Sequence, residues 1–387
     1  MTDVFANDYN EARQRFRDAA TALGWPCRAF VVDGLGPHGE ELTIDVASSS
    51  WPALASSPWA SPSPSSSPSG SRSSSPADRV LVVSSGLHGI EGFFGSAAQC
   101  ATMARWSTQP PAAAIRYVFI HALNPHGFAW QRRVDAGNVD PNRNFLPDGA
   151  PFRGSPATYA ALDGLLNPRH PPSRLDPLLP RAVAAIARHG MPALKQALTA
   201  GQHDFPRGLF FGGHEPSHTR IVLEEHFRSW VGSASQVLHL DLHTGLGASG
   251  SCALLVDYAA TAHQQEALTR WFGQGSYELS GSRGVGYQAH GSLGPWCLAG
   301  RFAPEYVFAF AEFGTYSNLK VLAGLRAENQ AHFWGRPDAP ASVRATRRLR
   351  ELFCPAGRVW RSTVLERSHD LIERGARGLA ASSRLHP

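Results

Sequence analysis

The fold is decided by residues 79–121, which read RVLVVSSGLHGIEGFFGSAAQCATMARWSTQPPAAAIRYVFIH. The apolar run at residues 79–84 predicts a strand, residues 92–106 have the pattern of a helix, and residues 115–121 predict a second strand. A strand, a helix and a strand at this spacing form a βαβ unit, which favours a parallel sheet covered by helices. We therefore expect an α/β fold.

Similar patterns predict further elements around this unit. Strands are expected at residues 28–32, 42–46, 237–242, 252–257 and 306–312, and helices at residues 7–23, 158–166, 180–189, 217–230, 261–272, 319–333 and 342–353. We predict one domain over residues 1–387, with a three-layer α/β/α core, a mixed and mostly parallel sheet, and a helical insertion at residues 162–230.

Residues 48–76 differ from the rest of the chain in composition. They are mostly Ser, Pro and Ala, with a few tryptophans, and cannot bury enough apolar surface to become ordered. Because strands are predicted on both sides, we interpret this stretch as a disordered Ser/Pro-rich insertion that expands a hairpin loop, and we expect it to have no function of its own.

Composition and charge exclude several classes of protein. The formal charge is +5, but Lys195 and Lys320 are the only lysines and the arginines are spread along the chain, so we expect no nucleic-acid partner. No stretch of about 18 apolar residues appears, so we expect no membrane partner. The N-terminus lacks a basic start followed by an apolar run, which favours a cytoplasmic location. The five cysteines form no Cys-x-x-Cys pair, which argues against a thiolate zinc site.

Two short segments carry side chains that can bind a metal ion. In residues 87–91 (LHGIE), His88 and Glu91 follow the strand at residues 79–84, where an α/β sheet is expected to bind its ligand. In residues 241–244 (DLHT), His243 ends a predicted strand and shares one face with Asp241, which either supports the imidazole or only lines that face. Each segment also has an ordinary structural explanation, as a helix start or a packed strand end.

Three further segments can supply an anion clamp, an oxyanion donor and a base. Asn142 and Arg143 lie in the turn VDPNRN (residues 139–144), where a guanidinium and an amide can hold a carboxylate. One of Arg132 and Arg133 can polarise a carbonyl. Glu312 ends the apolar run at residues 306–311, and a carboxylate there is costly unless it has a partner or a role. Each Arg taken alone is explained as well by a structural salt bridge.

Residues 214–218 read HEPSH and match the helical zinc motif His-Glu-x-x-His. That motif requires an uninterrupted helix, whereas Pro216 lies inside this segment and Gly212 and Gly213 precede it. A helix can only begin about here, so we do not expect a metal site from this match.

With these segments in order, residues 79–333 resemble the zinc carboxypeptidase superfamily, and more closely its branch of predicted carboxypeptidase-like domains of unknown function. The resemblance implies one Zn²⁺ per chain, bound by His88, Glu91 and His243. It implies Asn142 and Arg143 as the clamp for the terminal carboxylate of the substrate and Glu312 as the catalytic base. Arg132 or Arg133 would stabilise the oxyanion, and we prefer Arg133. The segment YQAHGS at residues 287–292 is similar to the one that bears the mobile Tyr of the family, which implies this role for Tyr287.

We therefore expect a zinc-dependent hydrolase that acts on an amide bond next to a free carboxylate, with a peptide or a small molecule as substrate. Two alternatives remain open from the sequence. One is a deacylase or esterase of small N-acyl amino acids or other acylated metabolites. The other is a protein that holds zinc without catalysis.

Overall fold

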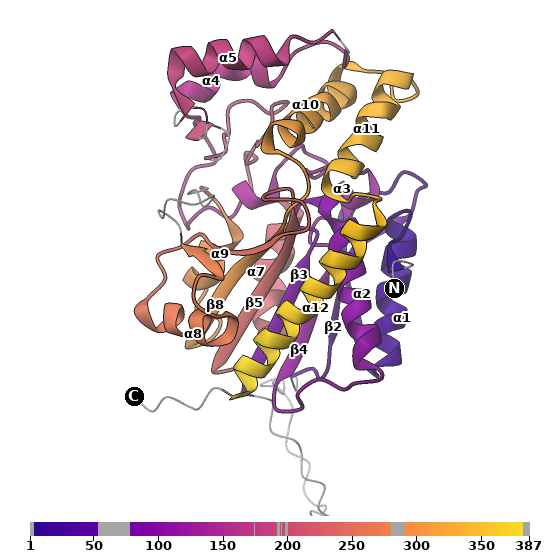
Figure 1. Ribbon diagram of the computed structural model, residues 1–387, viewed down its shortest axis with the longest axis vertical. Coiled ribbons are helices and arrows are strands. Elements are labelled where there is room, and N and C mark those ends of the chain that lie inside the picture. The colour runs from indigo at the N-terminus through magenta and orange to yellow at the C-terminus, as the bar shows by residue number, and fades with distance from the viewer. Residues whose placement is uncertain are drawn as a thin grey trace, which may run out of the picture.

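A mixed sheet of eight strands runs through the centre of the molecule (Figure 1). The computed structural model describes residues 4–52, 78–173, 175–191, 194, 196–197, 200–279 and 290–381. Within this part of the chain the strand order is β1-β2-β4-β3-β5-β8-β6-β7. The strands are β1 (Cys27–Leu35), β2 (Glu41–Ser48), β3 (Arg79–Ser85), β4 (Arg116–His121), β5 (Gln236–Thr244), β6 (Cys252–Val256), β7 (Tyr277–Leu279) and β8 (Glu305–Phe313).

The four central strands, β4, β3, β5 and β8, are parallel, so their carboxyl ends lie at one edge of the sheet. β1, β2 and β6 pair antiparallel with their inner neighbours, and β7 pairs parallel with β6. The centre of β5 is fully buried on both faces, as parallel strands covered by helices are.

Helices cover both faces of this sheet and make three layers (Figure 1). α1 (Tyr9–Ala22), α2 (Gly92–Trp106) and α12 (Arg358–Ala381) pack together on one face, and α12 contacts both α2 and β3. On the other face, α7 (His218–Val231) and α9 (Leu293–Ala299) meet through Phe227 and Trp296, whose ring centroids are 6.2 Å apart. The predicted α/β class and the three-layer α/β/α arrangement with a mixed sheet are confirmed.

The remaining helices lie around this core. They are α3 (Pro125–Ala129), α4 (Ala157–Leu166), α5 (Leu178–His189), α8 (Ala262–Phe272), α10 (Asn318–Trp334) and α11 (Pro340–Phe353). α4 and α5 lie beyond the carboxyl edge of the sheet, beside α10 (Figure 1). Arg326 of α10 bonds to the Leu165 carbonyl at 2.5 Å and pairs with Asp176, so polar contacts tie this region to α10.

All the strands and helices predicted from the sequence are present, with ends that differ by a few residues. The hairpin interpretation is wrong, because β4 lies between β2 and β3 and pairs with both of them. Most of the predicted insertion at residues 48–76 lies outside the described residues. Within the predicted insertion at residues 162–230, Phe227 and Trp230 of α7 belong to the main core, whereas Leu162 and Leu166 belong to a separate small cluster. No helix in the described ranges has the length and apolar character needed to cross a membrane.

Candidate metal centre

Three polar side chains meet at the carboxyl ends of β3 and β5. His88 lies in the turn after β3, and Glu91 ends the short 3-10 helix η2 (Gly89–Glu91) where α2 begins. His243 is the second-last residue of strand β5, directly before Thr244. Crossover connections bring these strand ends together, and ligand sites of open α/β sheets form at this edge.

The turn that carries His88 and Glu91 is held against neighbouring backbone. The Ile90 N–H donates to the Arg132 carbonyl at 2.8 Å. A Cβ added at Gly89 would lie only 2.1 Å from the carbonyl carbon of Gly127, so the close approach of these two segments requires glycine at position 89.

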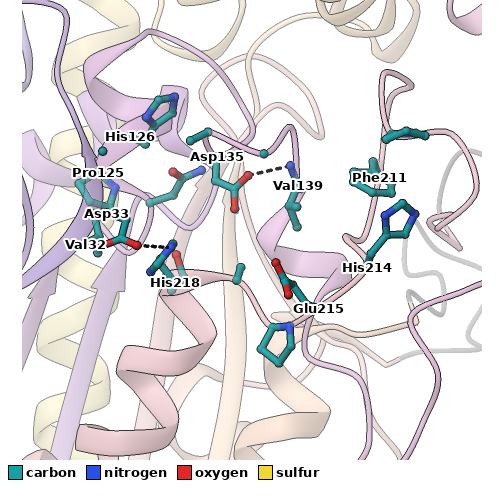
Figure 2. Close-up of a pocket in the computed structure, with 18 residues that line it drawn as sticks. Val32, Asp33, Pro125, His126, Asp135, Val139, Phe211, His214, Glu215 and His218 are labelled. Atoms are coloured by element: carbon teal, nitrogen blue, oxygen red, sulfur yellow. Dashed lines mark hydrogen bonds and ion pairs between the residues drawn. The ribbon is translucent and has the colours of Figure 1, made fainter.

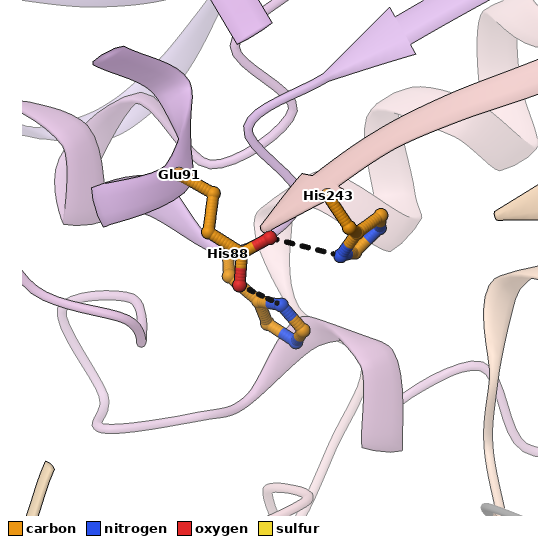
Figure 3. A group of neighbouring side chains, drawn as sticks. All are labelled: His88, Glu91 and His243. Atoms are coloured by element: carbon orange, nitrogen blue, oxygen red, sulfur yellow. Dashed lines mark hydrogen bonds and ion pairs between the residues drawn. The ribbon is translucent and has the colours of Figure 1, made fainter. Parts of the chain in front are cut away.

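Glu91 lies between the two imidazoles (Figure 3). Its Oε1 is 2.9 Å from His88 Nδ1, and its Oε2 is 3.0 Å from His243 Nδ1. One ligand atom from each of the three side chains lies within 4.8 Å of the others, and all three residues are buried. Among the described residues this is the group of His, Cys, Asp and Glu that has the geometry to hold a metal ion.

A second carboxylate lies behind each imidazole. His243 Nε2 is 2.6 Å from Asp241 Oδ2, and His88 Nε2 is 3.1 Å from Asp140 Oδ1. Metal-binding histidines commonly bond through their other ring nitrogen to a carboxylate, which fixes the orientation of the ring. Both imidazoles therefore present Nδ1 to Glu91 and to the centre of the group.

The electrostatics of the group favour a cation at its centre. Burial alone would raise the pKa of Glu91, but the nearby imidazoles of His88 and His243 outweigh it and lower this pKa well below the ordinary value. Burial opposes charge on His243, but Asp241 and Glu91 raise its pKa well above the usual range. Two imidazole nitrogens and one carboxylate oxygen are ligands that Zn²⁺ takes in catalytic sites, so the residues present fit this ion.

Arg133 faces the group, and Arg132 does not. Arg133 Nη2 lies 2.6 Å from His88 Nε2, and its Nε donates to Asp140 Oδ2 at 3.1 Å. Arg132 Nε instead donates to Glu328 Oε1 at 2.8 Å, which forms a buried ion pair with α10. Of the two arginines predicted as oxyanion donors, the structure places Arg133, and not Arg132, beside the group of His88, Glu91 and His243.

Asn142 and Arg143 lie in the 3-10 turn η3 (Pro141–Arg143), directly after Asp140. The Asn142 N–H donates to Asp140 Oδ1 at 3.0 Å, and Asn142 Oδ1 accepts the Leu293 N–H at 3.0 Å. Burial would raise the pKa of Asp140, but Arg133, His88 and Arg143 hold it well below the ordinary value. The positive charges of Arg133 and Arg143 therefore both stabilise the ionised carboxylate of Asp140.

Asp140 lies in the VDPNRN turn, but the sequence alone indicates no role for it. It is fully buried and contacts His88, Arg133 and the backbone of Asn142. The signal that could have identified it is its place two residues before Asn142, in a turn that must face a strand end carrying a histidine.

Glu312 lies beside His243, because β5 and β8 are parallel and in register at these residues. Paired residues of adjacent strands are about 4.8 Å apart and point to the same face. Burial raises the pKa of Glu312 to about 7, while His243 and Arg133 oppose this effect and Glu91 and Asp241 add to it. Glu312 Oε2 has no hydrogen-bond partner within the described part of the chain.

The sequence model of the family described as "Protein of unknown function (DUF2817)" matches residues 5–53 and 72–367. The chain is a member of the DUF2817 family. The predicted relationship to a branch of unknown-function domains is thereby confirmed, and it extends on both sides of the resemblance found in the sequence. A search of curated proteins finds no match to this DUF2817 chain.

Among solved structures, this DUF2817 chain is similar to bovine thrombin-activatable fibrinolysis inhibitor, at 9% identity and a TM-score of 0.48, with 96% of this chain and 97% of that chain covered. It is similar to carboxypeptidase A from Helicoverpa armigera, at 13% identity and a TM-score of 0.43, covering 89% and 73%. It is also similar to the murein-tripeptide amidase MpaA from Escherichia coli O157, at 16% identity and a TM-score of 0.35, covering 82% and 97%. None of these likenesses identifies the reaction of the DUF2817 chain.

The segment His214–His218 is not a helical metal motif in this DUF2817 structure. α7 begins at His218 with Ser217 as its N-cap, so His214 lies before the helix. The segment lines a cavity of about 450 Å³ together with Asp135 and Val139 (Figure 2). There His218 pairs with Asp33 at 3.1 Å and His214 Nε2 contacts the His203 carbonyl at 2.9 Å. The two histidines thus have separate partners.

Tyr287 lies outside the described residues, so its predicted role remains a prediction. The chain is described again from His290, and the turn that follows contacts the Asn142–Arg143 turn. Phe145 N–H donates to the Gly291 carbonyl at 2.9 Å, and Ser292 Oγ lies 3.2 Å from Asn142 Oδ1. The end of the segment that carries Tyr287 is therefore packed against the predicted carboxylate clamp.

Proposed function

We propose that this chain is a zinc-dependent hydrolase that cleaves an amide bond adjacent to a free carboxylate. The observation that carries the proposal is the buried group of His88, Glu91 and His243, whose ligand atoms lie within 4.8 Å of one another. Zn²⁺ bound by these three side chains would supply Lewis-acid polarisation of a carbonyl and lower the pKa of water. Further support comes from Arg133 and Glu312, which lie beside the group.

The residues around the group have complementary roles in this reaction. Glu312 accepts a proton from the attacking water and donates it to the leaving amine as the C–N bond breaks. Arg133 stabilises the negative charge that develops on the carbonyl oxygen. Arg143, with Asn142, holds the free carboxylate of the substrate, because a guanidinium can donate two parallel hydrogen bonds to it.

The proposal is tested by metal content and hydrolysis in the same preparations. We expect about one zinc per chain in the parent and in Glu312→Gln, and almost none in His88→Ala, because His88 supplies a ligand and Glu312 does not. On a mixed panel of N-acylated dipeptides and N-acyl amino acids, the parent should show hydrolysis, His88→Ala should show almost none, and Glu312→Gln should lose activity by about 10²–10⁴-fold. The panel also separates the peptide substrates from the small acylated ones.

Glu305→Gln is the matched control. Glu305 begins the same strand, is half-buried and bonds to Gln236 Nε2 at 2.7 Å, at the opposite edge of the sheet from the metal group. It should keep zinc and activity. A parent that takes up no zinc, or a Glu312→Gln variant as active as Glu305→Gln, would contradict the proposal.

A further inference from the structure

A chain of buried polar side chains runs below His243, away from the centre of the metal-binding group. His243 Nε2 is 2.6 Å from Asp241 Oδ2, and Ser84 Oγ is 2.6 Å from Asp241 Oδ1. Ser84 Oγ is 2.7 Å from His239 Nε2, and His239 Nδ1 is 2.8 Å from Tyr306 Oη. Each of the five residues is at most 4% exposed.

The sheet places these residues in one row. Ser84 on β3 pairs with Asp241 on β5, and β8 brings Tyr306 beside Val237. Alternate residues of a strand share a face, so His239, Asp241 and His243 point the same way, under α7 and α9. On that side Phe227 of α7 stacks on His239, with 5.7 Å between the ring centroids. The row thus lies in an interior where an unpaired polar atom is costly.

Counting donors gives this row one direction. The Ser84 hydroxyl has a single proton, and a carboxylate only accepts, so Ser84 donates to Asp241. Ser84 Oγ must then accept from His239 Nε2, which therefore carries the ring proton. His239 is neutral because burial lowers its pKa to about 4, so its Nδ1 has a free lone pair that accepts from the Tyr306 hydroxyl.

His243 donates through Nε2 to the second oxygen of Asp241. Its Nδ1 lies 3.0 Å from Glu91 Oε2, which also only accepts, so both ring nitrogens donate in this structure. A metal ion bound at Nδ1 would replace the proton there, whereas the proton on Nε2 would stay bonded to Asp241. At His88 the contacts are less selective, because Nε2 has both Asp140 and the Arg133 guanidinium within reach. The row of residues below His243 therefore determines which ring nitrogen of His243 is directed toward a metal ion.

We propose that Ser84 and His239 are positioning residues of the metal centre: they orient Asp241, which holds His243 in the tautomer that offers Nδ1 to a metal ion. This inference rests on the metal site of the proposed function. Without the Ser84 hydroxyl, Asp241 Oδ1 loses its donor and His239 Nε2 loses its acceptor, so Asp241 is free to turn and His243 is less well oriented.

The test is the zinc dissociation constant, measured by competition with a chelator on the metal-free full-length protein. Partners behind a ligating histidine typically change metal affinity by about 10–100-fold, and we expect this weakening in Ser84→Ala. Ser84→Thr keeps the hydroxyl and should bind zinc nearly as tightly as the parent. Ser368→Ala is the matched control, since Ser368 is also fully buried and, within the described residues, its hydroxyl donates to the Leu365 carbonyl on α12. If the loss of zinc affinity came from a general loss of packing, Ser368→Ala would bind zinc more weakly as well.

A second measurement needs no variant of Ser84. Ring ¹⁵N shifts of the parent, assigned to His239 by its absence in His239→Gln, distinguish the two neutral tautomers, and the proposal expects the proton on Nε2. A proton on Nδ1 would overturn the inference, as would a Ser84→Ala variant that folds and binds zinc as tightly as the parent. If the parent itself binds no zinc, the metal site of the proposed function fails first, and that outcome is distinct from the other two.

Discussion

Arg132 and Arg133 are adjacent in the chain, but their guanidinium groups point to different partners. Arg133 contacts His88 and Asp140, whereas Arg132 pairs with Glu328 on α10. We expect Arg133→Gln to lower kcat/KM by about 10²–10³-fold with zinc retained, because a donor that meets the developing oxyanion is lost.

Arg132→Gln should behave in the opposite way. It leaves the Glu328 carboxylate unpaired in a site where both side chains are less than one-tenth exposed, and breaking a buried pair costs about 3–5 kcal/mol of unfolding free energy. Its folded fraction should keep kcat/KM. Urea unfolding and steady-state kinetics on both variants distinguish the structural role of Arg132 from the catalytic role of Arg133. A catalytic loss confined to Arg132→Gln would contradict these roles.

At the residue scale, the sequence was sufficient to predict which three side chains meet in the candidate metal group, because strand ends and a short turn place them with little freedom. His88, Glu91 and His243 were predicted as one group, and the structure brings them together. The choice between Arg132 and Arg133 could not be derived from the sequence, since the direction of each side chain depends on a loop without periodicity. The role of Asp140 could not be predicted for the same reason.

At the element scale, two turns from distant parts of the chain meet at the predicted carboxylate clamp. Gly291 has a φ of +73°, and a Cβ there would lie 2.4 Å from the Arg143 carbonyl oxygen. Gly291→Ala should therefore displace the Arg143 turn, raising KM more than it lowers kcat, and destabilise the fold by over about 2 kcal/mol.

Gly275 is a close match for this test. It has a similar φ of +76°, but nothing lies within 4 Å of an added Cβ. Gly275→Ala should cost only the strain of the left-handed backbone, about 1–2 kcal/mol, and should leave KM unchanged. Equal effects of the two variants on KM would show that the contact of Gly291 with the Arg143 turn does not matter for substrate binding.

The order of the strands shows where prediction of elements from the sequence reaches its limit. Alternation and apolar runs identified β2, β3 and β4, because these patterns depend only on local burial. That β4 separates β2 from β3 is decided by long-range packing, such as the antiparallel pairing of Val46 with Ile120, which no local pattern contains. α12 was not predicted, and its sequence includes Gly375 and Gly378, which lower helix propensity.

At the scale of the whole molecule, folding also buries histidines outside the group of His88, Glu91 and His243. His121 is fully buried between α1 and α2: it stacks on Phe16, and its Nε2 is 3.0 Å from Ser96 Oγ. Burial, with a smaller effect of Arg13, lowers its pKa to about 3. Its contribution to stability is therefore complete above the unfolded pKa of about 6.5 and is lost as the pH falls toward 3.

His121→Phe removes this group and keeps a ring of similar size. Between pH 7 and pH 5 the unfolding free energy of the parent should fall by about 2 kcal/mol relative to this variant, because only the unfolded parent gains a proton at residue 121.

The comparison of the parent with Asp135→Asn should show a change of the opposite sign. Burial raises the pKa of Asp135 to about 6, so its contribution is present below the unfolded pKa near 4 and is lost as the pH rises through 6. Relative to Asp135→Asn, the parent should gain up to about 1 kcal/mol over the same fall in pH, a value reduced because the side chain is only half-buried. Urea unfolding of the three proteins at both pH values measures each difference directly, and differences of the same sign would show that burial does not govern the two groups.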